Sequence, residues 1–154
     1  MTDFELVIKT LADFGKQKAA ELREKAVTKE ITDTELIDND DYIPDWKQID
    51  YSNTPIGTPV RDPSDETGQV YKLWQQHDAT NQPDWNPKQA VSLWDVAHTT
   101  NPEKAKPYVA PQGTRGLYQK GEVMVWTDKK IYRSKVDNNS YTPDSRNVDW
   151  EVVE

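Results

Sequence analysis

The stretch Trp85–Val96 reads WNPKQAVSLWDV, and the stretch Tyr141–Val152 reads YTPDSRNVDWEV. Both contain an aromatic residue, a proline two positions later and, seven positions after that proline, a Trp followed by an acidic residue and Val. A further match precedes each stretch: Val70-Tyr71-Lys72 before the first and Ile131-Tyr132-Arg133 before the second. This agreement in residue type and in spacing indicates two copies of one small module.

The composition favours small units with aromatic cores. At 154 residues the chain is close to one average domain, yet it has six Trp and seven Tyr and few aliphatic residues. Because there is no Cys, disulfides, thiol nucleophiles and cysteine-bound zinc are excluded. Modules of this size without disulfides need aromatic packing or oligomerisation for their stability.

The net charge of −8 is concentrated in one segment. Residues 31–70 carry ten acidic and two basic side chains, whereas acids and bases balance on either side. This distribution argues against nucleic acid as a partner, since nucleic acid needs a basic face. The N-terminus has acids where a signal peptide has bases, and no stretch is apolar enough to span a membrane. We therefore expect a protein made in a cytoplasm, without a membrane partner.

Residues 1–30 are predicted to form an amphipathic helix, capped by Thr2 or Asp3. Its apolar side chains fall on or near one stripe: Phe4, Val7, Ile8, Leu11, Phe14, Ala19, Leu22 and Ala26. A helix of this kind cannot bury its apolar side alone. It either packs on the rest of the chain or pairs with its copies in a homo-oligomer, and the coiled-coil-like spacing is compatible with the second alternative.

The rest of the chain is predicted to hold short strands, which makes the fold class α+β. Residues 31–56 are expected to be an acidic linker of turns and extended chain, with a helical turn at Thr34–Ile37. The expected order after it is a first antiparallel β module at 57–98, a Pro-rich connector at 99–112 and a second β module at 113–154. In the second module, Thr127-Asp128-Lys129 is predicted to be the turn of a hairpin.

Several segments resemble a known group of proteins. They are Ile43-Pro44-Asp45-Trp46, Ile56-Gly57-Thr58-Pro59-Val60, Val70-Tyr71-Lys72, Gln82-Pro83-Asp84-Trp85-Asn86-Pro87, Tyr108-Val109-Ala110-Pro111-Gln112-Gly113, Tyr118-Gln119-Lys120-Gly121-Glu122-Val123 and Val136-Asp137-Asn138-Asn139. The modules resemble carbohydrate-binding module families 5 and 12. The whole chain resembles small carbohydrate-binding tail-tip proteins of siphophages that infect Gram-positive bacteria such as Bacillus. This resemblance implies a virion protein whose partners are other tail proteins and the polysaccharide of the host cell wall.

Sugar binding of this kind needs exposed flat aromatic rings beside amide groups. The residues that fit are Trp74, Trp85, Trp126 and Tyr141, with Asn86 and Asn138 as hydrogen-bonding neighbours. For the four aromatic residues, burial in a core or in a protein interface is an equal alternative. Tyr71, Tyr132, Trp94 and Trp150 recur in both copies, and we expect them to form the module cores.

Enzymatic activity is not expected from the sequence. His77 and His98 are the only histidines, and neither belongs to a recognisable nucleophile motif. Asp38, Asp40 and Asp41 lack the Gly and the distal Glu of a calcium loop, and no phosphate-binding loop is present, so neither a metal nor a cofactor is predicted. Two functions remain: adhesion of a phage tail tip to wall polysaccharide, or a purely structural tail component that binds virion proteins and no sugar.

Overall fold

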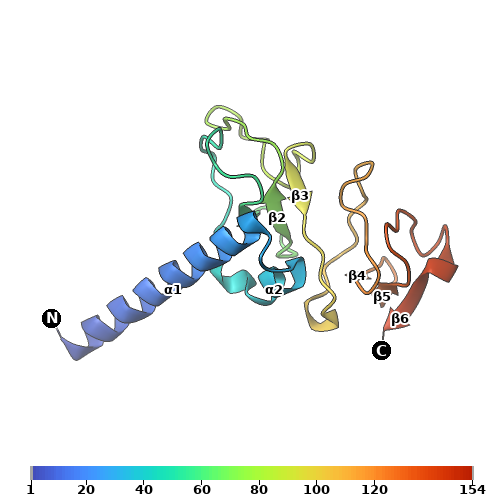
Figure 1. The fold of residues 1–154 in the computed structure, drawn as a ribbon, viewed down its shortest axis with the longest axis horizontal. Helices are drawn as coiled ribbons and strands as arrows, with labels where there is room; N and C mark the ends of the chain where they lie inside the picture. The colour runs from blue at the N-terminus through green and yellow to red at the C-terminus, as the bar shows by residue number, and fades with distance from the viewer. Residues whose placement is uncertain (1, 154) are drawn as a thin grey trace.

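The structure is a computed structural model that describes residues 2–153. One long helix, α1 (Asp3–Thr28), and a short one, α2 (Asp33–Asp38), precede two three-stranded antiparallel sheets. The first sheet contains β1 (Pro59–Arg61), β2 (Val70–Leu73) and β3 (Trp94–Val96), and the second contains β4 (Val123–Val125), β5 (Ile131–Ser134) and β6 (Trp150–Val153). Short 3-10 turns are η1 (Asp40–Tyr42), η2 (Pro102–Lys104) and η3 (Asn147–Asp149). The predicted α+β class with two tandem β modules is confirmed (Figure 1).

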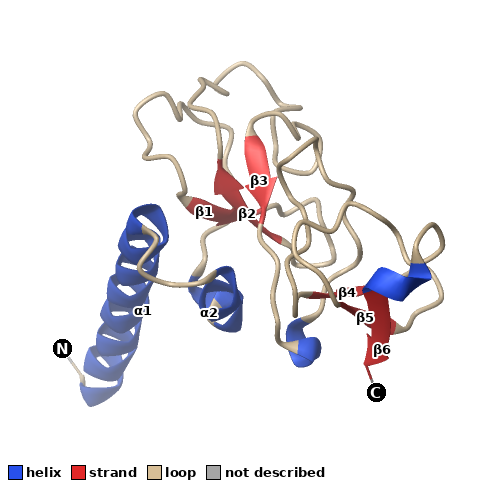
Figure 2. Cartoon of the chain, turned by 45° about the vertical axis from the view of Figure 1, so that its right-hand side comes forward, coloured by secondary structure: helices blue, strands red, loops and turns tan. Residues whose placement is uncertain are grey.

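Helix α1 begins and ends as its sequence predicts. The Thr2 hydroxyl accepts from the Glu5 N–H while the Glu5 carboxylate accepts from the Thr2 N–H, which forms a capping box. The helix ends where Lys29 takes a left-handed conformation, with φ 61°. Its N-terminal half extends away from the rest of the molecule (Figures 1 and 2). The apolar side chains from Phe4 to Phe14 are therefore exposed.

The segment after α1 is packed rather than extended in its first part. Thr32 caps α2, whose Leu36 and Ile37 are fully buried together with Ile43. These side chains form one cluster with Leu22 of α1 and with Val70 and Ala97 of the first module. The sequence pointed to a solvated linker here because acidic residues dominate, whereas the few apolar residues fasten the first module to α1 and α2.

The two sheets share one hydrogen-bonding frame. In the first, Tyr71 of β2 pairs with Val60 and Val96, and in the second Tyr132 of β5 pairs with Met124 and Val152. A turn with glycine at its third position leads into each sheet, and its glycine has φ 93° at position 57 and φ 94° at position 121. Because other residues rarely adopt such angles, both copies need Gly at this point.

A backbone latch explains the repeated motif. The Trp94 indole N–H donates to the Trp85 carbonyl at 3.1 Å, and the Trp150 indole N–H donates to the Tyr141 carbonyl at 2.9 Å. The proline between each pair, Pro87 or Pro143, is buried. The fixed spacing therefore places the loop carbonyl beside the buried indole. Without this acceptor, the indole N–H would be buried and unsatisfied.

Each module extends further toward the N-terminus than its composition indicates. The Trp46 N–H donates to the Arg61 carbonyl at 2.6 Å, and the Tyr108 N–H donates to the Val125 carbonyl at 3.0 Å, so each sheet gains a short parallel bridge. The hydroxyls of Tyr51 and Tyr118 accept from equivalent backbone N–H groups, those of Lys47 and Val109, both at 3.1 Å. Residues assigned to the linker and the connector are thus parts of the modules.

The cores of the modules differ in size. Around Trp94, the first module buries Tyr51, Val60, Tyr71, Leu73 and Ala79. The second buries Tyr118, Met124 and Trp150, with Tyr108, Trp126 and Tyr132 half-buried against them. The predicted core positions are confirmed as buried for Tyr71, Trp94 and Trp150, while Tyr132 is half-buried.

Candidate functional site

Trp74 is the most exposed tryptophan at a predicted sugar-binding position. It follows β2 directly, its N–H donates to the Leu93 carbonyl at 2.9 Å, and 47% of its side chain is accessible. The guanidinium of Arg115, from the second module, lies 5.0 Å from the centre of the indole ring. The ring is thus held by its backbone and by a cation–π contact.

Tyr141 of the second module also has an Arg beside its ring, although its counterpart in the repeat is Trp85 and not Trp74. Its side chain is 51% exposed, and the Arg146 guanidinium lies 5.7 Å from its ring centre. Arg146 also pairs with Asp149 at 2.7 Å. Unlike the contact between Trp74 and Arg115, this one joins residues of the same module, so Tyr141 belongs to a surface separate from the module junction.

The other two predicted aromatic residues are half-buried. Trp85 packs edge-on against His77, with ring centres 5.8 Å apart, and belongs to the rim of the first core. Trp126 packs edge-on against Tyr108 at 5.2 Å and belongs to the rim of the second core. For both residues the packing alternative therefore accounts for much of the ring surface.

Asn86 is a structural residue, which corrects its assignment as a sugar ligand. It is 5% exposed, and its Nδ2 donates to Asp62 Oδ2 at 2.7 Å. Burial alone would raise the pKa of Asp62, but hydrogen bonds from Ser64, Lys88 and Asn86 outweigh it and lower that pKa. The Asp62 carboxylate thus fastens the aromatic-x-Pro loop to the end of β1.

Asn138 is exposed and lies in a turn of the second module. It has φ 53°, and its backbone N–H donates to Gln119 Oε1 at 3.0 Å while its Oδ1 accepts from Gln119 Nε2 at 3.2 Å. Its left-handed conformation suits Asn better than most residues. Of the six predicted residues, Trp74, Tyr141 and Asn138 are thus exposed, whereas Trp85 and Trp126 are half-buried and Asn86 is buried.

Both histidines are packing residues in this fold. His98 stacks on Tyr118 with ring centres 3.8 Å apart, and its Nε2 lies 2.9 Å from the Gly116 carbonyl oxygen. Burial lowers the pKa of His98, which favours the neutral ring. His77 is buried between Tyr51, Trp85 and Trp94, and its Nδ1 lies 2.7 Å from the Gln75 carbonyl oxygen.

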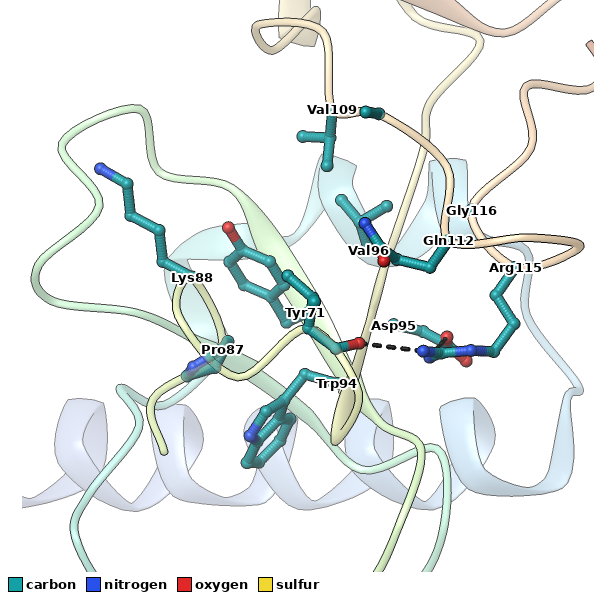
Figure 3. Close-up of a pocket in the computed structure, with 12 residues that line it drawn as sticks. Tyr71, Pro87, Lys88, Trp94, Asp95, Val96, Val109, Gln112, Arg115 and Gly116 are labelled. Carbon is teal, nitrogen blue, oxygen red and sulfur yellow. Dashed lines mark hydrogen bonds and ion pairs between the residues drawn. The ribbon is translucent and has the colours of Figure 1, made fainter. Parts of the chain in front are cut away.

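Arg115 joins the two modules, and sequence reasoning missed it. Its Nη1 donates to Asp95 Oδ1 at 2.6 Å and its Nη2 donates to the Val91 carbonyl at 2.9 Å, in addition to the contact with Trp74. Figure 3 shows the loop containing Arg115 and Gly116 beside Asp95 and Val96 of the first module. A small pocket of about 60 Å³ lies between this loop and β3. The only local signal was the two glycines around Thr114-Arg115, which lie at the predicted start of the second module.

A charged groove runs along the same junction. Lys72 Nζ lies 2.7 Å from Asp33 Oδ1, so the first sheet is paired with α2 beside the pair formed by Arg115 and Asp95. Glu122 of the second module lines the neighbouring recess with these residues. Burial raises the pKa of Glu122 to about 7, although the Gln119 N–H, which donates to its Oε1 at 2.6 Å, acts in the opposite direction. Nearby Asp33 raises this pKa further.

Searches of the described residues for other kinds of site give the following results. No group of three or more potential metal ligands (His, Cys, Asp or Glu) is found within residues 2–153. Across the same range, no helix combines the length and the apolar character that crossing a bilayer requires. Comparison of the chain with models of known protein families and with curated proteins finds no match.

Proposed function

We propose that this protein is an adhesion component of a phage tail tip, made in the host cytoplasm, that binds wall polysaccharide through its tandem modules. The observation that supports this function best is the pairing of an exposed aromatic ring with an Arg in both copies: Trp74 with Arg115 and Tyr141 with Arg146. Rings held in this way offer flat apolar surface to a sugar at little entropic cost, because few torsions must be fixed on binding.

The N-terminal helix supports a homo-oligomeric form of this adhesin. Six apolar side chains in its first half are more than 50% exposed: Phe4, Leu6, Val7, Ile8, Leu11 and Phe14. Most of them follow a spacing of three and four residues, as in helices that associate side by side. Association of copies would multiply weak sugar contacts into useful avidity.

A structural tail component without sugar binding is the second candidate. One observation favours it: Arg115 already covers part of the Trp74 ring and ties it to the second module. In that case the exposed aromatic rings and the apolar helix face would dock on other tail proteins, as aromatic residues often do at protein interfaces.

Binding to isolated Gram-positive cell walls separates the two candidates. The intact protein is incubated with walls before and after removal of teichoic acids, and the bound fraction is measured by sedimentation. Adhesion predicts saturable binding to at least one preparation. A folded protein that binds neither preparation would overturn the adhesion function and favour the structural one.

The oligomeric form is tested with substitutions in α1. A double variant with Leu11→Glu and Phe14→Glu places charges in the apolar stripe, so we expect a smaller species by light scattering and weaker wall binding. Gln17→Glu, at an exposed position beyond the stripe, is the matched control and should change neither property. An unchanged mass for the double variant would contradict assembly through α1.

A further inference from the structure

We infer that an uncharged sugar ring binds in the groove between α1, α2 and the first sheet, with Trp74 as its stacking surface; this inference rests on the proposed wall-binding function. The groove has a volume of about 350 Å³ and is open to solvent. It is bordered by Lys29 after α1, Asp33 of α2 and Ile56, Lys72 and Trp74 of the first module. Its volume lies at the lower end of the range for small-molecule sites.

Trp74 supplies the apolar surface that a pyranose ring needs. The C–H groups on one face of a sugar pack against an aromatic ring, whereas the hydroxyls point outward to polar partners. Arg115 restricts the orientation of the indole, because the guanidinium is itself held by Asp95 and by the Val91 carbonyl. The stacking surface is therefore formed before a ligand arrives, which reduces the entropic cost of binding.

The charged residues around Trp74 can form hydrogen bonds with the hydroxyls of such a ligand. Asp33 and Asp95 both line the groove, and each uses its Oδ1 atom in an ion pair, with Lys72 and Arg115 respectively. An ionised carboxylate offers about four acceptor positions, so each can still accept from a sugar hydroxyl. The Lys72 ammonium, with three donors, can donate to a sugar oxygen in addition to its partner.

The charge balance favours an uncharged ligand. Asp33 and Lys72 of the groove neutralise each other, and Asp95 is neutralised by Arg115 beside Trp74, so among the lining residues Lys29 alone adds a charge. The protein as a whole carries a net charge of −8, and the excess acids lie in the segment 31–70 that borders the groove. This field opposes the approach of a polyanion such as a teichoic acid chain. A neutral sugar ring is therefore the better fit.

The inference is tested with soluble wall fragments. Muramidase digests of Gram-positive walls are separated by anion exchange into neutral and anionic oligosaccharide fractions. Each fraction is added to the intact protein while the indole N–H signals are followed by NMR. The Trp74 signal is assigned by its absence from Trp74→Phe. Binding of the intact protein to whole walls is measured in parallel.

Substitutions in the groove should weaken binding of the neutral fraction, whereas a substitution outside it should not. We expect the neutral fraction to shift the Trp74 signal, and we expect Trp74→Ala to weaken affinity for it by about tenfold or more. Lys72→Met should weaken it by about three- to tenfold, the effect of one lost hydrogen bond. Lys130→Met is the matched control for Lys72→Met, since it removes an ammonium group at an exposed turn of the second module, outside the groove, and it should bind the neutral fraction as the parent protein does.

Each other outcome has a definite meaning. If the parent protein binds walls and both Trp74→Ala and Lys72→Met bind as tightly, the groove is overturned while adhesion stands. If only the anionic fraction shifts the Trp74 signal, the uncharged ligand is overturned. If the parent protein binds neither walls nor fragments, adhesion and the groove fall together. If Trp74→Ala does not fold, the affinity of Lys72→Met for the neutral fraction decides whether the groove is the binding site.

Discussion

The two modules are built on the same backbone frame but are supported in different ways. The first rests on α1 and α2 through Val70 and Ala97 and buries a broad core around Trp94. The second buries fewer side chains around Trp150, and its N-terminal segment is joined to α2 and η1 by polar contacts, of Asn101 with Asp38 and of Lys104 with Asp40. Where the first has Leu73, the second has Ser134, whose hydroxyl donates to the Val136 carbonyl at 2.7 Å. An equivalent strand register thus coexists with unequal cores.

The smaller core of the second module is offset by one longer loop in that module. From the equivalent positions Lys47 and Val109, the chain takes four residues to reach Tyr51 but nine to reach Tyr118. The added length carries Gly116 and Arg115 onto the first module, and His98 of the first module then stacks on Tyr118. The second module therefore obtains from its neighbour the support that its own core lacks.

Of the substitutions that compare the two modules, removal of the latch indoles of Trp94 and Trp150 should lower the free energy of unfolding most. Trp94→Ala and Trp150→Ala each delete a buried ring, and we expect each to lower the free energy of unfolding by about 3–5 kcal/mol. The measurement is urea denaturation followed by circular dichroism. Trp→Phe at the same positions keeps the ring but leaves the carbonyl at 85 or 141 without its donor, so a smaller loss is expected. A loss below about 1 kcal/mol for either Ala variant would contradict a shared latch.

Removal of the Arg115 guanidinium, which joins the two modules, should weaken the contact between them. Arg115→Met loses two charge-assisted hydrogen bonds and the contact with Trp74, and we expect a loss of about 1.5–3 kcal/mol. Faster amide exchange is expected in the second module, because that module depends on the docking. Arg146→Met, which removes a stacked Arg with its own ion pair inside one module, is the control. Equal effects of the two variants would show that Arg115 has no special role between modules.

Proton binding should also distinguish the modules. At equivalent turns the first module has Thr58 and the second has Glu122. The pKa of Glu122 is raised from 4.5 to about 7 on folding, so the folded state binds the proton more tightly. This stabilisation is complete below pH 4.5 and is lost as the pH rises to about 7 and above.

Glu122→Gln tests that linkage. Its stability should decrease less between pH 5 and pH 8 than that of the parent protein, by roughly 1–2 kcal/mol. Urea denaturation at both pH values gives the difference. Glu103→Gln, at an exposed turn, serves as the control. Parallel pH profiles for Glu122→Gln and the parent protein would refute a titration of Glu122 in this range.

The smallest effect is expected at the turns between the first two strands of each sheet. Gly68 has φ 71° and Lys129 has φ 70°, so one module uses glycine and the other a strained lysine. Lys129→Gly should raise the thermal unfolding temperature by a small amount, corresponding to about 0.5–1 kcal/mol. Gly68→Ala should lower stability by a similar amount. Destabilisation by Lys129→Gly would show that the lysine side chain outweighs the strain.

Much of the fold was predictable because its determinants are local. The spacing of Phe4 to Ala26 predicted α1, and the repeat from Pro87 to Trp94 and from Pro143 to Trp150 predicted two modules, because both patterns depend on residues close in sequence. The packing of Leu36 and Ile37 on Val70 was missed, since acidic neighbours mask a few decisive apolar side chains. The burial of Asn86 was missed for a related reason: its partner Asp62 lies 24 residues away.

The candidate site was only partly predictable for the same reason. Trp74 was identified from its position after a strand, but its partner Arg115 comes from the other module and its groove includes Asp33 of α2. No local pattern relates these three segments. Arg115 reaches Trp74 because the longer loop of the second module docks on the first, and Asp33 lies at the groove because Leu36 and Ile37 pack α2 on the first module.

The indole latch also makes the loop of the second module suitable for the display of varied side chains. Its acceptor is the main-chain carbonyl of residue 85 or 141, not the side chain, and the natural protein already uses Trp at one position and Tyr at the other. Side-chain identity at these two positions is therefore separated from the hydrogen bond that closes the loop. A library randomised at the exposed position 141, with Pro143 and Trp150 kept, would sample new binding surfaces, whereas the ring of Trp85 is part of the rim of the first core.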